Sequence, residues 1–162
     1  MAKVFCVFIG LLLSLSVIPV SAQQLERGAS GKLGCIGNHK FRLGGGEISL
    51  TSYVFRNFNP DTTLTVTGIS FYAADGTVLL SMPGFVLGPN RTASFDTIGV
   101  FGSSPSGAPT SEPLQVIVNW TASARALDLF VTATRQERGR DTTTGALLEQ
   151  RTRSGNRCVT LR

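Results

Sequence analysis

Apolar and polar side chains alternate along most of this chain, and a period of two residues predicts β-strands. The alternation is clearest over residues 114–122, where Trp120 shares one face with an apolar residue at every second position. No window has the apolar spacing of a helix of three turns. We therefore predict an all-β fold, an immunoglobulin-like antiparallel β-sandwich of seven to eight strands, with Trp120 as a core anchor. The other predicted strand segments are residues 47–57, 64–71, 77–81, 85–87, 91–98, 126–134, 146–153 and 157–161.

The alternation slips by one residue at Gly68. Leu64 and Val66 share one face, whereas Ile69 and Phe71 fall in the opposite phase. One extra residue in a strand reverses the pleat, and glycine tolerates the unusual backbone that this requires. We expect a β-bulge at Gly68 that returns all four apolar side chains to the core.

Short runs of glycine, proline, asparagine and aspartate separate the predicted strands. Residues 75–76 are an Asp-Gly pair that predicts a tight hairpin. Residues 82–84 and 88–90 combine proline with glycine and predict further turns. Residues 57–61 place Asn57, Asn59 and Asp61 at alternate positions, as in a calcium loop, but Pro60 breaks that pattern and turn chemistry is the better interpretation.

The first 22 residues have the composition of a secretory signal peptide. Lys3 gives a charged start, residues 4–20 are an apolar run, and Ser21 and Ala22 end it with small side chains. We expect cleavage after Ala22 and export to the periplasm or the medium. The chain has no second apolar run of that length, so no transmembrane segment is expected after cleavage.

Cys35 and Cys158 are the two cysteines beyond the predicted signal peptide. An exported chain meets an oxidising compartment, so we predict a disulfide between them that closes nearly the whole chain. Residues 23–46 contain many glycines and are expected to form an irregular lead-in, with a short edge strand near residues 36–41. The sandwich domain is expected to comprise residues 47–162.

Positive charge is concentrated at the C-terminal end. The chain has a net charge of +5, and residues 122–162 carry eight arginines against four acidic residues. The segment 135–145 is predicted to be a hairpin that presents neighbouring arginines to an anionic partner. The candidate binding residues are Arg135, Arg138, Arg140, Arg151 and Arg153.

Two alternatives stay open for these loops. The hairpin arginines are also consistent with a solvated turn in which they pair with Glu137, Asp141 and Glu149. The segment 99–113 is predicted to be a long flexible loop, either a binding loop or an unconstrained surface connection. Asn90 and Asn119 fit the glycosylation sequon, a pattern that is frequent by chance.

The residues needed for catalysis are sparse. His39 is the only histidine, and its polar, glycine-rich neighbourhood predicts a solvated loop residue instead of a general base. No Gly-x-Ser-x-Gly elbow is present, and one histidine with two distant cysteines does not give the spacing of a metal site. We expect no metal and no cofactor. The alternative is a secreted hydrolase that uses paired carboxylates in a cleft.

Several short segments resemble a family of small exported bacterial β-sandwich proteins of unknown function. The resemblance covers residues 47–135. Both cysteines and most of the arginine-rich part lie outside this range. It implies a sandwich and an extracytoplasmic location, and it implies no catalytic residues. The segments that carry the resemblance are Phe55-Arg56-Asn57, Ile69-Ser70-Phe71-Tyr72, Asp75-Gly76, Leu87-Gly88-Pro89 and Val118-Asn119-Trp120-Thr121-Ala122.

The sequence as a whole predicts an exported, non-enzymatic protein that acts by binding or as a structural part of the cell envelope. The basic surface favours an anionic partner, such as an envelope lipid, an acidic polysaccharide or an acidic protein. Nucleic acid is a poor partner, because the arginines are not interleaved with aromatic residues and no nucleic-acid-binding module is recognisable. The pattern does not predict an oligomeric state.

Overall fold

The computed structural model describes residues 27–42, 47–102, 115–140, 144 and 147–161. The predicted signal peptide at residues 1–22 and the larger part of the predicted loop, residues 103–113, lie outside the described residues. The elements are β1 (Arg27–Ile36), β2 (His39–Arg42), β3 (Glu47–Arg56), β4 (Leu64–Tyr72), β5 (Val78–Leu87), β6 (Thr92–Asp96), α1 (Thr97–Phe101), β7 (Gln115–Leu127), β8 (Phe130–Arg140), β9 (Leu147–Arg157) and β10 (Val159–Leu161).

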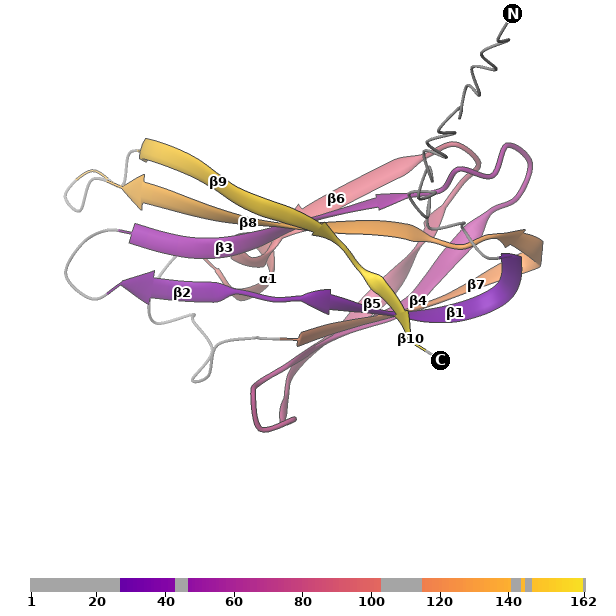
Figure 1. The fold of residues 1–162 in the computed structure, drawn as a ribbon, viewed down its shortest axis with the longest axis horizontal. Coiled ribbons are helices and arrows are strands. Elements are labelled where there is room, and N and C mark those ends of the chain that lie inside the picture. The colour runs from indigo at the N-terminus through magenta and orange to yellow at the C-terminus, as the bar shows by residue number, and fades with distance from the viewer. Residues whose placement is uncertain (1–26, 43–46, 103–114, 141–143, 145–146, 162) are drawn as a thin grey trace, which may run out of the picture.

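These strands form two antiparallel sheets that pack against each other (Figure 1). Sheet A has the strand order β10-β1-β7-β4-β5. Sheet B has the order β2-β3-β8-β9, and β6 follows β2 along the same edge of β3. The predicted immunoglobulin-like antiparallel β-sandwich with one disulfide is confirmed. The predicted number of seven to eight strands is wrong, because the described residues alone form ten.

Side chains from both sheets meet in one apolar core, and each fully buried large side chain contributes about 1.5–3 kcal/mol. Trp120 is 2% exposed, which confirms its predicted role as a core anchor. Tyr53 of sheet B packs edge-on against Phe71 of sheet A with ring centroids 6.2 Å apart. The fully enclosed core therefore joins the two sheets. Its larger members are Leu33, Tyr53, Phe55, Leu64, Val66, Ile69, Phe71, Leu87, Val116, Val118, Trp120, Leu129 and Val131.

The predicted bulge in β4 is confirmed. Val66 pairs with Trp120 of β7, but the next pair is Gly68 with Asn119, so one residue of β4 is left over. The apolar residues on both sides of this slip are buried. The bulge therefore keeps the inward face of β4 continuous despite the change of phase in the sequence.

The expected irregular lead-in is wrong for the described part of residues 23–46. Residues 27–36 form β1, which lies inside sheet A between β7 and β10. Gly31 pairs directly with Trp120, and a Cβ at Gly31 would lie 2.6 Å from the indole Nε1. A Cβ at Gly34 would lie 3.2 Å from the side chain of Leu161. These glycines make room for large neighbours within a regular strand.

Four predicted strand boundaries also differ. The predicted turn at residues 82–84 is wrong, because β5 runs through it, and its place at the edge of sheet A tolerates Pro83. The next residue, Gly84, must lack a side chain, because a Cβ there would collide with the carbonyl oxygen of Val66. The turn before β8 lies at residues 128–129 instead of before residue 126. Residues 97–98, predicted to end the strand 91–98, and residues 99–101, predicted to begin the long flexible loop, belong to α1. β9 continues to Arg157.

His39 is not the solvated loop residue that its neighbours in the sequence predicted. It lies in β2, is 2% exposed and packs against Phe101 of α1 with ring centroids 5.3 Å apart. Burial lowers the pKa of His39, and the negative charge of Asp96 opposes that shift.

Thr97 closes the gap between β2 and β6, because its hydroxyl accepts from the backbone N–H of Thr51 at 3.2 Å and donates to the carbonyl of Asn38 at 3.0 Å.

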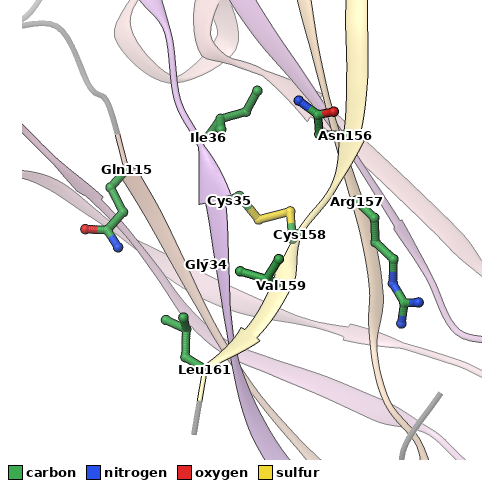
Figure 2. A pocket seen from close by; sticks show the side chains of 9 residues that line it. All are labelled: Gly34, Cys35, Ile36, Gln115, Asn156, Arg157, Cys158, Val159 and Leu161. Carbon is green, nitrogen blue, oxygen red and sulfur yellow. A yellow bond between two sulfur atoms is a disulfide. The ribbon is translucent and has the colours of Figure 1, made fainter. Parts of the chain in front are cut away.

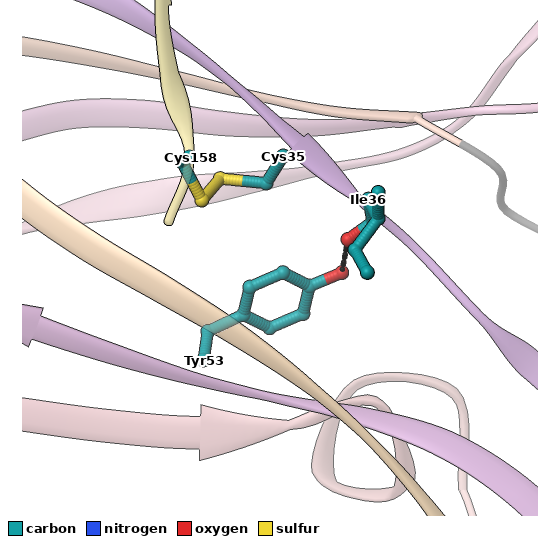
Figure 3. Close-up of a disulfide and its surroundings, with 4 residues drawn as sticks. All are labelled: Cys35, Ile36, Tyr53 and Cys158. Carbon is teal, nitrogen blue, oxygen red and sulfur yellow. Dashed lines mark hydrogen bonds between the residues drawn. A yellow bond between two sulfur atoms is a disulfide. The ribbon is translucent and has the colours of Figure 1, made fainter. Parts of the chain in front are cut away.

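The disulfide lies where the chain passes from sheet B to sheet A. Cys158 stands between the end of β9 and the start of β10, and its sulfur lies 2.04 Å from that of Cys35 in β1. Nearby, the Tyr53 hydroxyl donates to the carbonyl oxygen of Ile36 at 2.8 Å (Figure 3). The predicted disulfide is thus confirmed, and it links the first described strand to the crossover that completes the sandwich.

The helical content of the described residues is limited to the five residues of α1. No helix in this part of the chain is long and apolar enough to cross a membrane.

Candidate functional site

The arginines predicted to form one hairpin surface belong to a strand. Residues 130–140 are β8, so neighbouring side chains alternate between the two faces of sheet B. Arg135 lies opposite Thr51 of β3, on the face that carries Tyr53 inward further along that strand. Arg138 lies opposite Ile48, on the other face. The pleat therefore separates two residues that were expected to lie together.

Each of these two arginines already has an acidic neighbour. Arg138 Nη2 lies 3.4 Å from a carboxylate oxygen of Asp96 and also donates to Gln136 Oε1 at 3.0 Å. Arg135 Nη2 lies 3.9 Å from a carboxylate oxygen of Glu137, and its Nε donates to the Ser49 hydroxyl at 3.3 Å. An external anion at Arg135 or Arg138 must therefore compete with a carboxylate of the protein itself.

The three remaining candidate arginines lie around the same hairpin. Arg151 of β9 is exposed and pairs across the strands with Glu137. Arg140 and Arg153 belong to β8 and β9, but their side chains lie outside the described residues. We call Arg135, Arg138 and Arg151 the hairpin-end arginines.

A second basic group lies at the opposite end of sheet B. Phe130, the first residue of β8, has the Arg157 guanidinium carbon 4.9 Å from its ring centroid and that of Arg56 at 6.0 Å. Phe58 packs edge-on against the same ring at 5.5 Å and is 46% exposed. We call Arg56, Phe58, Phe130 and Arg157 the Phe130 cluster.

Strand register places this cluster on the outer face of sheet B. Arg56 lies opposite Phe130, in the phase opposite to the core residues Tyr53 and Phe55. Arg157 pairs with Thr132, one position further along the same face of β8. Among the described residues, neither Arg56 nor Arg157 forms an ion pair with a carboxylate. A guanidinium held over an aromatic ring uses none of its N–H groups on a carboxylate there, so these groups are available to an anion.

The loop that carries Phe58 is held by Asn57. The two N–H groups of Asn57 Nδ2 are shared among three backbone carbonyls, those of Thr62 at 2.8 Å, Leu87 at 3.0 Å and Gly88 at 2.9 Å. Its Oδ1 accepts from the backbone N–H and the side-chain amide of Asn59. Asn57 is 1% exposed. The interpretation of this segment as turn chemistry is consistent with these contacts.

Asn59 extends this network to sheet A. Its Oδ1 accepts from the backbone N–H of Leu127 at 2.7 Å, and its Nδ2 donates to the carbonyl of the same residue at 3.0 Å. Phe58 stands between the two buried asparagines and points a large apolar side chain toward solvent. A fixed loop with an exposed aromatic residue loses little conformational entropy when that residue meets a partner.

A shallow groove of about 430 Å³ lies beside the disulfide (Figure 2). Its lining is mainly apolar, with Ile36 at 42% and Val159 at 58% exposure. Arg157 is the one ionisable residue of this lining, and Figure 2 shows its side chain pointing away from the disulfide. The described lining of the groove therefore brings no two ionisable side chains together.

The described acidic residues give limited support for catalysis or metal binding. The pKa of Asp75 is lowered because its carboxylate accepts the backbone N–H of Thr77 in the β4–β5 turn. The described residues contain no group of three histidines, cysteines or acidic residues placed to hold a metal ion. The alternative of a hydrolase with paired carboxylates stays a prediction.

Comparison with known proteins gives little further information. No protein-family model matches the chain, and no curated protein matches it at a significant level. Among solved structures, the chain is similar to a crystal structure of a Thermotoga maritima protein, "Thermotoga maritima 1070". That similarity has a TM-score of 0.40 and 13% sequence identity, and it covers 78% of this chain and 92% of the other. Likeness at this level carries no functional argument, and the resemblance to small exported bacterial β-sandwich proteins stays a prediction.

The sequence did not reveal the Phe130 cluster. Its four members come from β3, the loop after β3, β8 and β9, and they meet because of strand register. The sole local signal is the run Arg56-Asn57-Phe58 at the end of a predicted strand. Which strand lies beside that run is not visible in the pattern of apolar residues.

Proposed function

We propose that this protein is exported and acts without catalysis, by binding an anionic component of the cell envelope or its surroundings. Candidate partners are an anionic lipid, an acidic polysaccharide or an acidic protein. The signal-peptide pattern of residues 1–22 supports export, and so does the disulfide, since disulfides persist mainly in oxidising compartments.

One observation carries this proposal. Arg56 and Arg157 flank the same phenylalanine ring on the outer face of sheet B, without a carboxylate partner among the described residues. Holding two guanidinium groups near each other costs electrostatic energy, and an incoming anion relieves that repulsion. A guanidinium also donates two parallel hydrogen bonds to a carboxylate or a phosphate group.

The Phe130 cluster suits this role better than the hairpin-end arginines. Arg135 and Arg138 have internal acidic neighbours at 3.9 Å and 3.4 Å, and an external anion must compete with them. Arg56 and Arg157 contact an aromatic ring instead. The hairpin nonetheless stays a candidate for a secondary contact, because Arg135 and Arg151 are exposed.

A comparison of two double variants tests the proposal. Arg56→Gln/Arg157→Gln and Arg135→Gln/Arg138→Gln each remove two positive charges, so they change the net charge equally. We expect the first pair to weaken retention on carboxylated and phosphorylated matrices by about tenfold, the cost of one good charged contact. We expect the second pair to have a smaller effect, and added salt to reduce retention of the unmodified protein.

The opposite order of effects would move the binding surface to the hairpin end. No retention of the unmodified protein on any anionic matrix at low salt would refute anion binding altogether. Thermal unfolding of each variant is measured in parallel, so that a loss of retention is not mistaken for a loss of fold.

A further inference from the structure

The outer face of sheet B around the Phe130 cluster carries a second kind of side chain. Arg56 lies opposite Thr92 of β6, and Val54 lies between Ser94 of β6 and Thr132 of β8. Ser52 pairs with Thr134 in the next row. Short hydroxyl side chains therefore extend the face away from the two arginines, as far as Asp96 of β6, which lies opposite Ser52.

These hydroxyl groups differ in how far they are exposed to a ligand. Thr92 and Ser94 are exposed, whereas Thr132 and Thr134 are half-buried within the sheet. A hydroxyl both donates and accepts a hydrogen bond, so a row of them matches a partner that is itself rich in hydroxyl groups. Neither an acidic peptide nor a lipid head group requires such a surface.

The arrangement of the arginines favours a long partner over a single small anion. Arg56 lies in β3 and Arg157 in β9, on either side of β8. The backbones of β3 and β9 are therefore two strand spacings, about 10 Å, apart. Two guanidinium groups that approach one ring from different strands suit two acid groups of an extended chain better than the two oxygens of one carboxylate.

The distribution of exposed apolar residues argues against a membrane surface. Phe58 is the large exposed apolar residue beside this cluster. The other described residues of this kind, Ile36, Val78, Val86 and Val159, belong to β1, β5 and β10 of sheet A. Insertion into a bilayer from the Phe130 cluster would therefore depend on a single phenylalanine, whereas stable membrane binding needs a larger buried apolar area.

We infer that the outer face of sheet B binds an acidic polysaccharide that carries carboxylate groups, with Arg56 and Arg157 on the carboxylates. Phe58 provides an aromatic surface for the C–H face of a sugar ring, and the serine and threonine hydroxyls bond to sugar hydroxyls. This inference rests on the proposed function and specifies its partner. It is the one candidate class that uses the charged, aromatic and hydroxyl side chains of this face together.

The test measures binding of the purified, disulfide-bonded protein to four probes by calorimetry at low salt. The probes are polygalacturonate, fully methyl-esterified polygalacturonate, poly-L-glutamate and vesicles that contain phosphatidylglycerol. We expect polygalacturonate to bind at least tenfold more tightly than its neutral ester, because the ester lacks the charge, and more tightly than poly-L-glutamate, because the peptide lacks the sugar.

Substitutions on this surface show which side chains contribute to the binding. Phe58→Ala keeps every charge, and we expect it to weaken polygalacturonate binding by about fivefold while leaving poly-L-glutamate binding unchanged. Arg56→Gln/Arg157→Gln is expected to weaken polygalacturonate binding by about tenfold or more. Arg135→Gln/Arg138→Gln, with the same loss of charge, is the matched control and is expected to change it little.

Several outcomes would overturn the inference, and they differ in what they leave intact. Equal affinity for polygalacturonate and poly-L-glutamate would show a contact of charge alone, which refutes the polysaccharide and keeps the proposed anion binding. Strong binding to vesicles alone, weakened by Phe58→Ala, would assign the surface to lipid. Absence of binding to all three anionic probes would refute the proposed function as well.

Discussion

Removal of the Cys35–Cys158 disulfide should lower the free energy of unfolding by about 5 kcal/mol. The bond joins residues that are 123 positions apart, so it closes a loop of nearly the whole described chain. The chain-entropy model assigns about 4.7 kcal/mol to a loop of about 100 residues, and the dependence on length is logarithmic. A loss of this size equals a large share of the stability of an ordinary domain.

The assay compares urea unfolding of the oxidised protein, the reduced protein and the variant Cys35→Ala/Cys158→Ala. Both cysteines are buried, at 6% and 5% exposure, so alanine also removes two sulfur atoms from the core. The reduced protein keeps those atoms and isolates the effect of the covalent link. For a domain of this size, the melting temperature should fall by about 10–20 °C.

A difference of less than about 1 kcal/mol between the oxidised and reduced proteins would contradict this prediction, because it is far below the value for so long a loop. Two free thiols in the denatured, unreduced protein would contradict it as well. Either result would mean that the sandwich does not depend on the link between β1 and the β9–β10 crossover.

Substitutions at three further residues test the packing. Asn57→Ala should cost about 3 kcal/mol in urea unfolding, because it leaves one buried and two part-buried backbone carbonyls without this partner. Asn57→Asp should cost at least as much at neutral pH, and unchanged stability of either variant would show that these hydrogen bonds do not hold the loop. Gly31→Ala should cost about 1–3 kcal/mol, because the new Cβ lies within 2.6 Å of the Trp120 ring, and unchanged stability with unchanged tryptophan fluorescence would show that the contact is not tight. The lowered pKa of His39 means that the unfolded chain binds its proton more readily, so stability should fall as pH drops below 6.5. His39→Gln should flatten that dependence between pH 7 and pH 5, and identical pH profiles would refute the assignment.

The sequence predicted the strands in which one face is buried in the core and the other face is not. Burial of one face leaves a pattern of period two in the sequence. The alternation around Trp120 therefore located β7, and the slip of phase at Gly68 located the bulge that the structure contains. It missed β1, because Gly31 and Gly34 resemble loop residues until their cross-strand neighbours are known.

The candidate site was less predictable, for a physical reason. In Arg135 to Arg140 every side chain is polar or absent, so a strand with solvent near both faces shows no alternation and resembles a loop. His39 is buried by Phe101, a residue 62 positions away in the chain. Contacts of this kind depend on strand order and register, which local patterns do not specify.

The most direct test of the account is to observe the arginine side chains during binding. The Nε–H signals of isotope-labelled, oxidised protein are followed by nuclear magnetic resonance while short polygalacturonate oligomers are added. The signals of Arg56 and Arg157 should shift first and furthest, with smaller changes at Arg135 and Arg138. Shifts confined to Arg135 and Arg138, or no change at Arg56 and Arg157 at saturating oligomer, would contradict this expectation.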